Sequence, residues 1–340
     1  MVPPLFINNI RYIGQMKDFL TCHTGKVQIL QRGLRMTNAQ NQVRVMETFR
    51  SIFYTPIYAS ISGGFWETAG IDVTFSTTPT EYPHPLSAIN HGAADIVQSG
   101  IMRSIIAADW GAEAVPIHFA KINARDGFFV LSRHLSKQFA WEDLKGSTLI
   151  PVGFSPMPWA SLQSALKKHL IQPTELRLLQ GLSLTEAISA FTEGEADYIH
   201  LPEPYAGQLI HQGIGHLVIS LGKENGHIAY SSFAAGTKFI EQKVDILDRF
   251  MSGYSKALEW LSSTGPEEIS GAVAPFFDKI PTSQIVDAIT RYKSQDTWSS
   301  TPDLNEPEYQ GLQDILLNAG MVIERQPYHK VVTTRFFQSP

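Results

Sequence analysis

Cysteine is nearly absent from this sequence, whose 340 residues include only Cys22. An internal disulfide therefore cannot form, and a zinc or iron–sulfur site built from several cysteines is impossible. A catalytic thiol needs a positioned histidine and a lowered pKa. Cys22 lies upstream of the region with a folded pattern, which begins near Val43. We therefore expect no metal and no cofactor.

Long apolar runs are lacking as well. No stretch approaches the roughly 18 apolar residues of a membrane-spanning helix. The apolar segments among the first 35 residues are shorter than the core of roughly 7 to 15 residues in a secretory signal. As the sequence is written, we expect a cytoplasmic protein without a membrane span. A periplasmic location becomes the expectation if the true start differs from the one written, for example if residues 1–35 are an upstream extension before Met36.

The sequence also has no excess of positive charge. Its net charge is -5 and 17% of its residues are charged, so neither nucleic acid nor an anionic membrane is an expected partner. The 43% hydrophobic content, with 19 Phe and 6 Trp, is ample for packed cores. At roughly 100 to 200 residues per domain, a chain of this length predicts two lobes.

A phrase that occurs twice suggests that the two lobes share one design. Residues 88–97 and 187–199 each place Ala-Ile on a short helix, then a glycine, then Ala-Asp at the start of an apolar strand. Glycine just after a helix accepts the left-handed backbone that ends it. The first copy runs into Gln98, Ser99 and Gly100, and the second into residues 200–204. Because ligands bind at the carboxyl ends of strands in open α/β sheets, we expect these two ends to face each other across a cleft.

Strands and helices alternate from residue 43 onward, which predicts α/β lobes with mainly parallel sheets. The predicted strands cover residues 43–49, 71–75, 95–97, 115–120, 128–132, 148–152, 177–179, 197–199, 218–221 and 229–234. A long helix is predicted over residues 241–262, where Leu247, Phe250 and Tyr254 fall at helical spacing. Another helix runs to about Leu170 and begins after Ser155. That serine either presents free backbone amides to an anion or simply caps the helix.

The ordered set of short motifs resembles the sulfonate, taurine and nitrate solute-binding proteins, which share a superfamily with the thiamine-pyrimidine synthase. The motifs are Tyr-Thr-Pro-Ile-Tyr-Ala at residues 54–59, Gly-Phe at 64–65, Ala-Gly-Ile-Asp-Val at 69–73, Asp-Leu-Lys-Gly at 143–146, Glu-Pro-Tyr-Ala at 203–206 and Lys-Ala-Leu-Glu-Trp at 256–260, together with both copies of the repeated phrase. Their order holds from about residue 43 to about residue 332. The resemblance implies a type 2 periplasmic-binding-protein fold, in which two α/β lobes close by hinge motion around a ligand. We expect residues 1–42 to form a tail or extension, residues 43–130 and 226–335 the first lobe, and residues 131–225 the second.

Carried over residue by residue, the resemblance implies ligand contacts from loops around the cleft. These are Phe53, Tyr54, Thr55, Ser99, Gly100, Arg125, Asp126, Phe154, Ser155, His200, Leu201, Glu203, Tyr230 and Ser231.

Several of these residues have alternative roles. Arg125 offers a guanidinium fork for a carboxylate, sulfonate or phosphate, or it is an exposed cation paired with Asp126. Glu203 accepts a hydrogen bond from the ligand, or it caps a helix that starts at Pro204. His200 contacts the ligand or transfers protons, or it is a hydrogen-bonded structural residue.

Aromatic side chains and other histidines have alternatives of their own. Tyr54, Phe154, Trp159 and Tyr230 provide aromatic surface for a flat ligand or belong to the core. A metal cluster of His91, His118 and His200 is not favoured, because these histidines lack the close spacing of a helical ligand motif.

The sequence departs from the enzymes of the superfamily. It lacks the cysteine-rich stretch of the synthase, it has no lysine between Lys26 and Lys121, and residues 50–55 lack the cysteine of the desulfinase-like branch. We therefore predict a solute-binding protein for a small anionic or heteroaromatic metabolite, delivering it to an ABC permease, with specificity leaning toward the second lobe and Arg125. The alternative is a cytoplasmic enzyme on the same fold, synthase-like or a lyase or decarboxylase, with His200 as its catalytic candidate.

Overall fold

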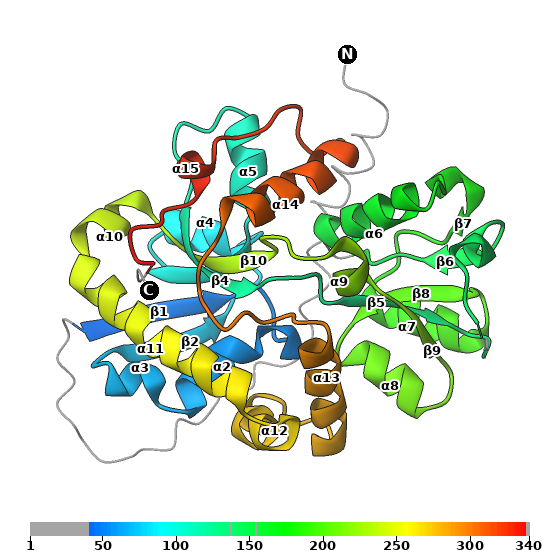
Figure 1. The fold of residues 1–340 in the computed structure, drawn as a ribbon, viewed down its shortest axis with the longest axis horizontal. Coiled ribbons are helices and arrows are strands. Elements are labelled where there is room, and N and C mark those ends of the chain that lie inside the picture. The colour runs from blue at the N-terminus through cyan, green and yellow to red at the C-terminus, as the bar shows by residue number, and fades with distance from the viewer. Residues whose placement is uncertain (1–40, 136–137, 154, 338–340) are drawn as a thin grey trace.

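The computed structural model describes residues 41–135, 138–153 and 155–337, and its strands form two five-stranded sheets that lie side by side in Figure 1. The first sheet has the order β2-β1-β3-β10-β4 and the second the order β7-β6-β8-β5-β9. Strands of the first sheet are β1 (Gln42–Glu47), β2 (Asp72–Thr77), β3 (Ile96–Gly100), β4 (Ile117–Asn123) and β10 (Ser231–Ala235). Strands of the second are β5 (Phe128–Ser132), β6 (Thr148–Ile150), β7 (Arg177–Leu178), β8 (Tyr198–Pro202) and β9 (His216–Ser220).

Both sheets follow the same plan. In each, three strands pair in parallel, and a fourth strand pairs antiparallel with both of its neighbours. The antiparallel strand is the one that enters from the other sheet, β5 after β4 and β10 after β9. The prediction of mainly parallel sheets is therefore half right, because a strand that crosses between sheets arrives from the opposite direction.

The repeated phrase performs the same structural task in each sheet. Helices α4 (Pro85–Asn90) and α7 (Leu184–Glu193) are followed by Gly92 at φ 68° and Gly194 at φ 93°. The aspartates that follow then accept a hydrogen bond from the backbone of the neighbouring parallel strand. Asp95 Oδ2 lies 2.9 Å from the Arg44 amide of β1, and Asp197 Oδ2 lies 2.8 Å from the Thr148 amide of β6. The predicted common design is confirmed at these joints.

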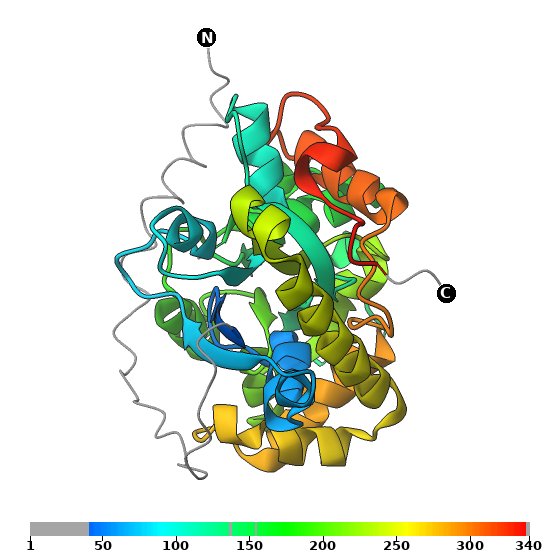
Figure 2. The same ribbon diagram turned by 90° about the vertical axis from the view of Figure 1, so that its left-hand side faces the viewer.

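Most helices surround the first sheet: α2 (Thr55–Ser62), α3 (Phe65–Thr68), α5 (Met102–Asp109), α10 (Thr237–Gln242), α11 (Val244–Ser263), α12 (Pro266–Val273) and α15 (Tyr328–Val331). The predicted apolar stripe of α11 is buried, and its Phe250 stacks on Trp66 with ring centroids 4.6 Å apart. Burying each such side chain contributes about 1.5 to 3 kcal/mol. Figure 2 shows α11 crossing this side of the molecule diagonally.

Helices α6 (Pro156–Lys168), α8 (Tyr205–His211) and α9 (Leu221–Asn225) accompany the second sheet, and two C-terminal helices reach over to it (Figure 1). Helix α13 (Thr282–Ser294) packs against α8, and α14 (Glu306–Asn318) packs against α6. No helix of the described residues is long and apolar enough to cross a membrane.

Two chain segments connect the sheets, residues 124–127 and residues 221–230. The first is tightly packed: a Cβ atom on Gly127 would lie 2.4 Å from the Phe53 ring. Its carbonyls also accept hydrogen bonds from the C-terminal region, Gly127 O from the Tyr292 hydroxyl at 3.0 Å and Asp126 O from Gln295 Nε2 at 2.9 Å. These contacts join the connection to Phe53 of the first half and to the C-terminal region.

Candidate functional site

A small cavity of about 50 Å³ lies between the two halves of the molecule. The half around the first sheet contributes residues after β1 and β3 and at the start of β10: Thr48, Phe49, Tyr54, Gly100, Met102, Arg103, Tyr230 and Ser231. The other half contributes Phe128, Ser155, Met157 and Pro158, from β5 and the beginning of α6. The walls are thus largely aromatic and apolar.

The cation in this cavity is Arg103, in the first turn of α5. No carboxylate of the described residues lies within ion-pair distance of it. Burial lowers the pKa of Arg103 to about 10, and burial together with the Arg103 charge lowers the pKa of the nearby His84 to about 4. A half-buried guanidinium without a counterion is costly, so the site is chemically suited to an anion.

Three buried side chains beside the cavity carry polar atoms without a hydrogen-bond partner among the described residues. They are the Tyr230 hydroxyl, Asp126 Oδ2 and both ring nitrogens of His200. Phe128 connects two of them, because its amide donates to Asp126 Oδ1 at 2.7 Å and its ring centroid lies 5.4 Å from that of His200. Most buried polar atoms in proteins are hydrogen-bonded. Of these three residues Tyr230 lines the cavity, so its hydroxyl is the group that a ligand in the cavity could partner.

Burial sets the protonation of these groups. It raises the pKa of Asp126 to about 7 and that of Tyr230 well above its ordinary value, and it lowers the pKa of His200 to about 3. At neutral pH the imidazole and the phenol are therefore uncharged, and a substantial share of the Asp126 carboxyl groups carries a proton. The uncompensated positive charge at the cavity comes from Arg103.

Five of the predicted contact residues line the cavity, namely Tyr54, Gly100, Ser155, Tyr230 and Ser231. Ser155 is the N-cap residue of α6, yet its side chain makes no capping hydrogen bond. Its hydroxyl is therefore not used in the way that plain helix capping requires. Phe154 lies outside the described residues.

The other predicted residues pack behind the cavity. The Phe53 ring lies 5.5 Å from that of Tyr230, and Thr55 donates its hydroxyl to the Ile52 carbonyl at 2.7 Å. Ser99 and Leu201 are buried in β3 and β8. These side chains support the wall without forming its surface.

Arg125 and Glu203 are committed to other partners. Arg125 donates to the Gly222 carbonyl at 3.2 Å and lies 3.8 Å from Asp296, so it neither lines the cavity nor pairs with Asp126 as predicted. Glu203 Oε2 accepts from the Gly207 amide at 3.0 Å and Oε1 lies 2.5 Å from Arg291 Nε, which realises the helix-capping alternative.

The segments that follow the two copies of the repeated phrase, residues 98–100 and 200–204, nonetheless lie near each other. The contact involves the backbone carbonyl of Glu203 and not its carboxylate. The Glu203 carbonyl accepts from the Ser51 hydroxyl at 3.3 Å, in the loop after β1. Gln98, next to that loop, accepts from the Thr48 amide at 2.9 Å. The arginine that lines the cavity, Arg103, belongs to the first half, and the lean of specificity toward the second lobe and Arg125 stays a prediction.

Sequence reasoning missed Arg103 because it predicted no helix over residues 102–109. The available signal was position: Arg103 follows the carboxyl end of β3 by three residues. Met102 and Met157, which also line the cavity, were missed as well. Their sequence neighbourhood does not distinguish them from core residues.

The histidines considered for a metal cluster lie in different settings. His118 is buried between the hydroxyls of Ser232, 2.6 Å from Nδ1, and Ser104, 3.0 Å from Nε2. His91 Nδ1 lies 2.7 Å from a helix carbonyl. Within residues 41–135, 138–153 and 155–337 we find no group of three or more histidine, cysteine or acidic side chains placed to hold a metal ion.

Comparison with known proteins identifies the family. The sequence profile of the NMT1/THI5-like family matches residues 52–269. The chain belongs to this family. It is also 33% identical over 292 residues to YtlA of Bacillus subtilis (strain 168), whose name describes it as a candidate binding protein; the match covers 86% of this chain and 87% of YtlA.

Solved structures that resemble this NMT1/THI5-like protein include two named as sulfonate-binding proteins. The alkanesulfonate-binding protein SsuA from Xanthomonas axonopodis pv. citri, bound to MOPS, has a TM-score of 0.67 and 17% identity, covering 86% of this chain and 98% of that one. The periplasmic aliphatic sulphonate-binding protein SsuA from Escherichia coli has a TM-score of 0.65 and 18% identity, covering 84% and 94%. These likenesses establish the two-lobed periplasmic-binding-protein fold, so the predicted fold class is confirmed.

Proposed function

We propose that the protein is a solute-binding protein that takes up a small organic anion between its two lobes, with Arg103 as the anchor for the negative group. The observation that carries the proposal is this guanidinium, which lines the interlobe cavity without a carboxylate partner among the described residues. A guanidinium donates two parallel hydrogen bonds to a sulfonate or carboxylate. The sulfonate ligands named for the two SsuA proteins have the charge that this arrangement requires.

The remaining wall suggests what the rest of the ligand resembles. Tyr54, Phe128 and Tyr230 provide aromatic surface around the cavity, and Met102 and Met157 provide adaptable apolar contacts. The Tyr230 hydroxyl lacks a partner among the described residues and is available to a polar ligand atom. We infer an anion with a compact apolar or heteroaromatic body.

Ligand entry requires the lobes to move. A cavity of about 50 Å³ accommodates a few water molecules, so an organic anion fits only if the walls separate. We propose that the part of the molecule around the first sheet moves against the part around the second, with bending in the connections at residues 124–127 and 221–230. Closure around the ligand would then bring Arg103 and Ser155 to the same anion.

We further propose that the protein delivers its ligand to an ABC permease, on the outer side of the membrane as for the periplasmic E. coli relative. Cell fractionation and N-terminal sequencing of the mature protein test this location. Recovery of the protein only from the cytoplasm would oppose it.

A panel of small anions tests the binding function. Calorimetry and thermal denaturation with MOPS, taurine, ethanesulfonate, nitrate, benzoate and a carboxylated pyrimidine should identify at least one ligand that raises the melting temperature. Arg103→Gln should abolish that effect. If no anion of the panel binds, or if the best one binds Arg103→Gln as well as the unaltered protein, the proposed site is wrong.

An enzyme on the same fold is the second candidate, because Asp126 has a pKa of about 7 and lies next to the cavity wall. A carboxyl group that titrates near neutrality is suited to proton transfer. Incubation with the best ligand, followed by chromatography and mass spectrometry, distinguishes the two functions. Conversion of the ligand that is lost in Asp126→Asn would favour catalysis, and an unchanged ligand would favour binding.

A further inference from the structure

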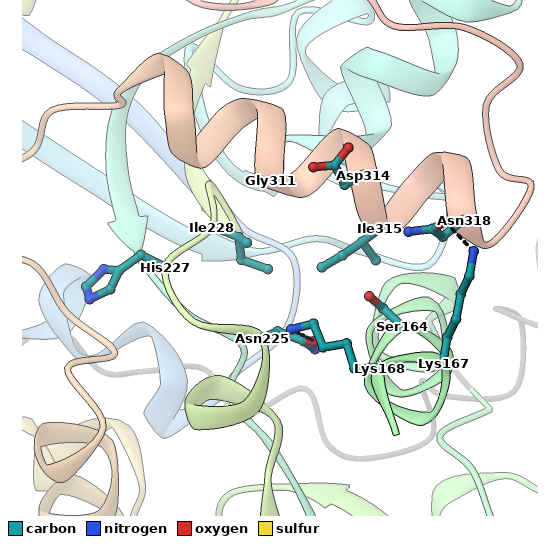
Figure 3. A pocket seen from close by; sticks show the side chains of 10 residues that line it. All are labelled: Ser164, Lys167, Lys168, Asn225, His227, Ile228, Gly311, Asp314, Ile315 and Asn318. Carbon is teal, nitrogen blue, oxygen red and sulfur yellow. Dashed lines mark hydrogen bonds between the residues drawn. The ribbon is translucent and has the colours of Figure 1, made fainter. Parts of the chain in front are cut away.

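A second and larger cavity, of about 370 Å³, lies away from the interlobe site. Figure 3 shows its walls: the end of α6 with Lys167 and Lys168, the last turns of α14 with Ile315 and Asn318, and the connection that carries Ile228. The two isoleucines extend toward each other across the space. The cavity therefore has an apolar side and a side with two lysines.

The lysines make hydrogen bonds only to uncharged acceptors. Lys167 Nζ donates to Asn318 Oδ1 at 2.7 Å, and Lys168 Nζ donates to the Glu224 carbonyl at 2.9 Å. No carboxylate in the described part of the chain lies within ion-pair distance of either ammonium group. An ammonium group has three hydrogens to donate, so both lysines retain hydrogen-bonding capacity for a ligand.

The acidic residue at the cavity, Asp314, does not neutralise them, because its carboxylate pairs with Arg325. The Ser164 hydroxyl, one turn before the lysines on α6, makes no hydrogen bond within the described structure and adds a neutral donor. The positive charges at the cavity that no carboxylate of the described residues pairs with are therefore those of Lys167 and Lys168, both of which are exposed.

The cavity also spans the parts of the molecule that we expect to move. Helix α6 packs on the second sheet through Leu162 and Leu166, whereas α14 contacts both α6 and α5, and α5 is one of the helices around the first sheet. Asn225 and Ile228 lie in the second connection between the sheets. A molecule held here would contact both halves and one connecting segment at once.

We propose that this cavity is a second binding site, for a small organic dianion, and that its occupant holds α6 against α14. Two ammonium groups match the two negative charges of a dicarboxylate or a phosphate monoester, and Ile228 and Ile315 match a short apolar body. A ligand that binds one arrangement of the lobes better than another shifts the population toward it. Occupancy would thus couple to lobe movement, independently of which molecule binds between the lobes.

Calorimetry at low ionic strength, where charge interactions are least screened, tests the site with succinate and with glycerol phosphate as separate probes. The unaltered protein should bind at least one of them, and Lys167→Gln/Lys168→Gln should weaken this binding tenfold or more. Lys238→Gln/Lys243→Gln, which removes two exposed lysines of the α10 region, is the matched charge control and should bind normally. The stronger probe identifies the preferred dianion.

Two further measurements locate the probe. Hydrogen exchange should slow in residues 160–170, 222–229 and 310–319, and Arg103→Gln should leave the affinity unchanged. The proposal is overturned if neither probe binds, if the Lys167/Lys168 double variant binds as well as the unaltered protein, or if Arg103→Gln abolishes binding. In the last case the anion occupies the interlobe site, and the proposed function of that site survives.

Discussion

The substitution Arg103→Gln tests the proposed anion site separately from the rest of the fold. Gln keeps much of the side-chain volume but removes the charge and the guanidinium fork. A hydrogen bond to a charged group contributes about 1.5 to 3 kcal/mol, so losing the paired interaction with an anion should cost about 3 kcal/mol, or roughly 150-fold in the dissociation constant.

This loss has a direct thermal signature. A ligand at about 100 times its dissociation constant stabilises the folded protein by about 2.7 kcal/mol. After a 150-fold loss of affinity, the same concentration contributes only about 0.3 kcal/mol. The ligand-induced rise in melting temperature should therefore fall from roughly 4 °C to below about 1 °C.

The ligand-free protein should respond in the opposite sense. Burial lowers the pKa of Arg103, which means that the folded state disfavours its charged form. Arg103→Gln should consequently melt at the same temperature as the unaltered protein or slightly above it. A variant that had merely misfolded would melt lower, so the two readings are distinct.

Two other arginines provide controls. Arg177→Gln, on the exposed surface of β7, makes the same change in net charge and should keep the full ligand response. Arg125→Gln tests the residue that the sequence favoured, and it too should retain ligand binding because its partners are Gly222 and Asp296. Loss of binding in Arg125→Gln with retention in Arg103→Gln would refute the assignment.

Further predictions concern the cavity wall and the connection. Tyr230→Phe removes a buried hydroxyl that has no hydrogen-bond partner among the described residues, so the melting temperature should not fall. Calorimetry should show anion affinity about five- to tenfold lower. A lower melting temperature with unchanged affinity would contradict this prediction. Burial raises the pKa of Asp126 from 3.8 to about 7, so between these pH values the folded state binds more protons than the unfolded state. The free energy of unfolding of the unaltered protein, relative to that of Asp126→Asn, should therefore fall as pH rises from 4 to 7. Urea unfolding at several pH values measures the difference in unfolding free energy between the two proteins. His118, whose lowered pKa gives a pH dependence of the opposite sign, is present in both and cancels in the difference. A difference that does not change with pH would contradict the prediction. Gly127→Ala places Cβ 2.4 Å from an aromatic ring and should cost about 1 to 3 kcal/mol in urea unfolding, whereas Gly271→Ala in α12, with open space around it, should stabilise by about 0.5 to 1 kcal/mol; equal effects would argue against steric crowding.

Local patterns in the sequence predicted many of the elements. The strand over residues 128–132 was placed with its observed bounds, and the helix predicted over 241–262 corresponds to α11. The glycines of the repeated phrase, Gly92 and Gly194, occupy the left-handed conformation that was expected of them. These features depend on residues close in sequence, because apolar spacing and glycine stereochemistry act within one turn or one strand.

Two structural features were missed because they depend on distant partners. Helix α5 has a weak local signal and is held by contacts such as that of the Asp109 carboxylate with the Ile323 amide, 3.0 Å apart. The antiparallel direction of β5 and β10 follows from the chain crossing between sheets. Neither feature can be predicted from the residues of the helix or strand alone.

The choice between two arginines shows where sequence information ends. From the sequence, Arg125 and Arg103 are each a cation near the end of a strand, and nothing local separates them. The tertiary structure pairs Arg125 with Asp296, 171 residues along the chain, and leaves Arg103 at the cavity without a counterion among the described residues. By itself the sequence determined the class of fold and the repeated lobe design. Which arginine lines the cavity without an opposite charge was decided only by folding, because the carboxylate that pairs with Arg125 comes from a distant part of the chain.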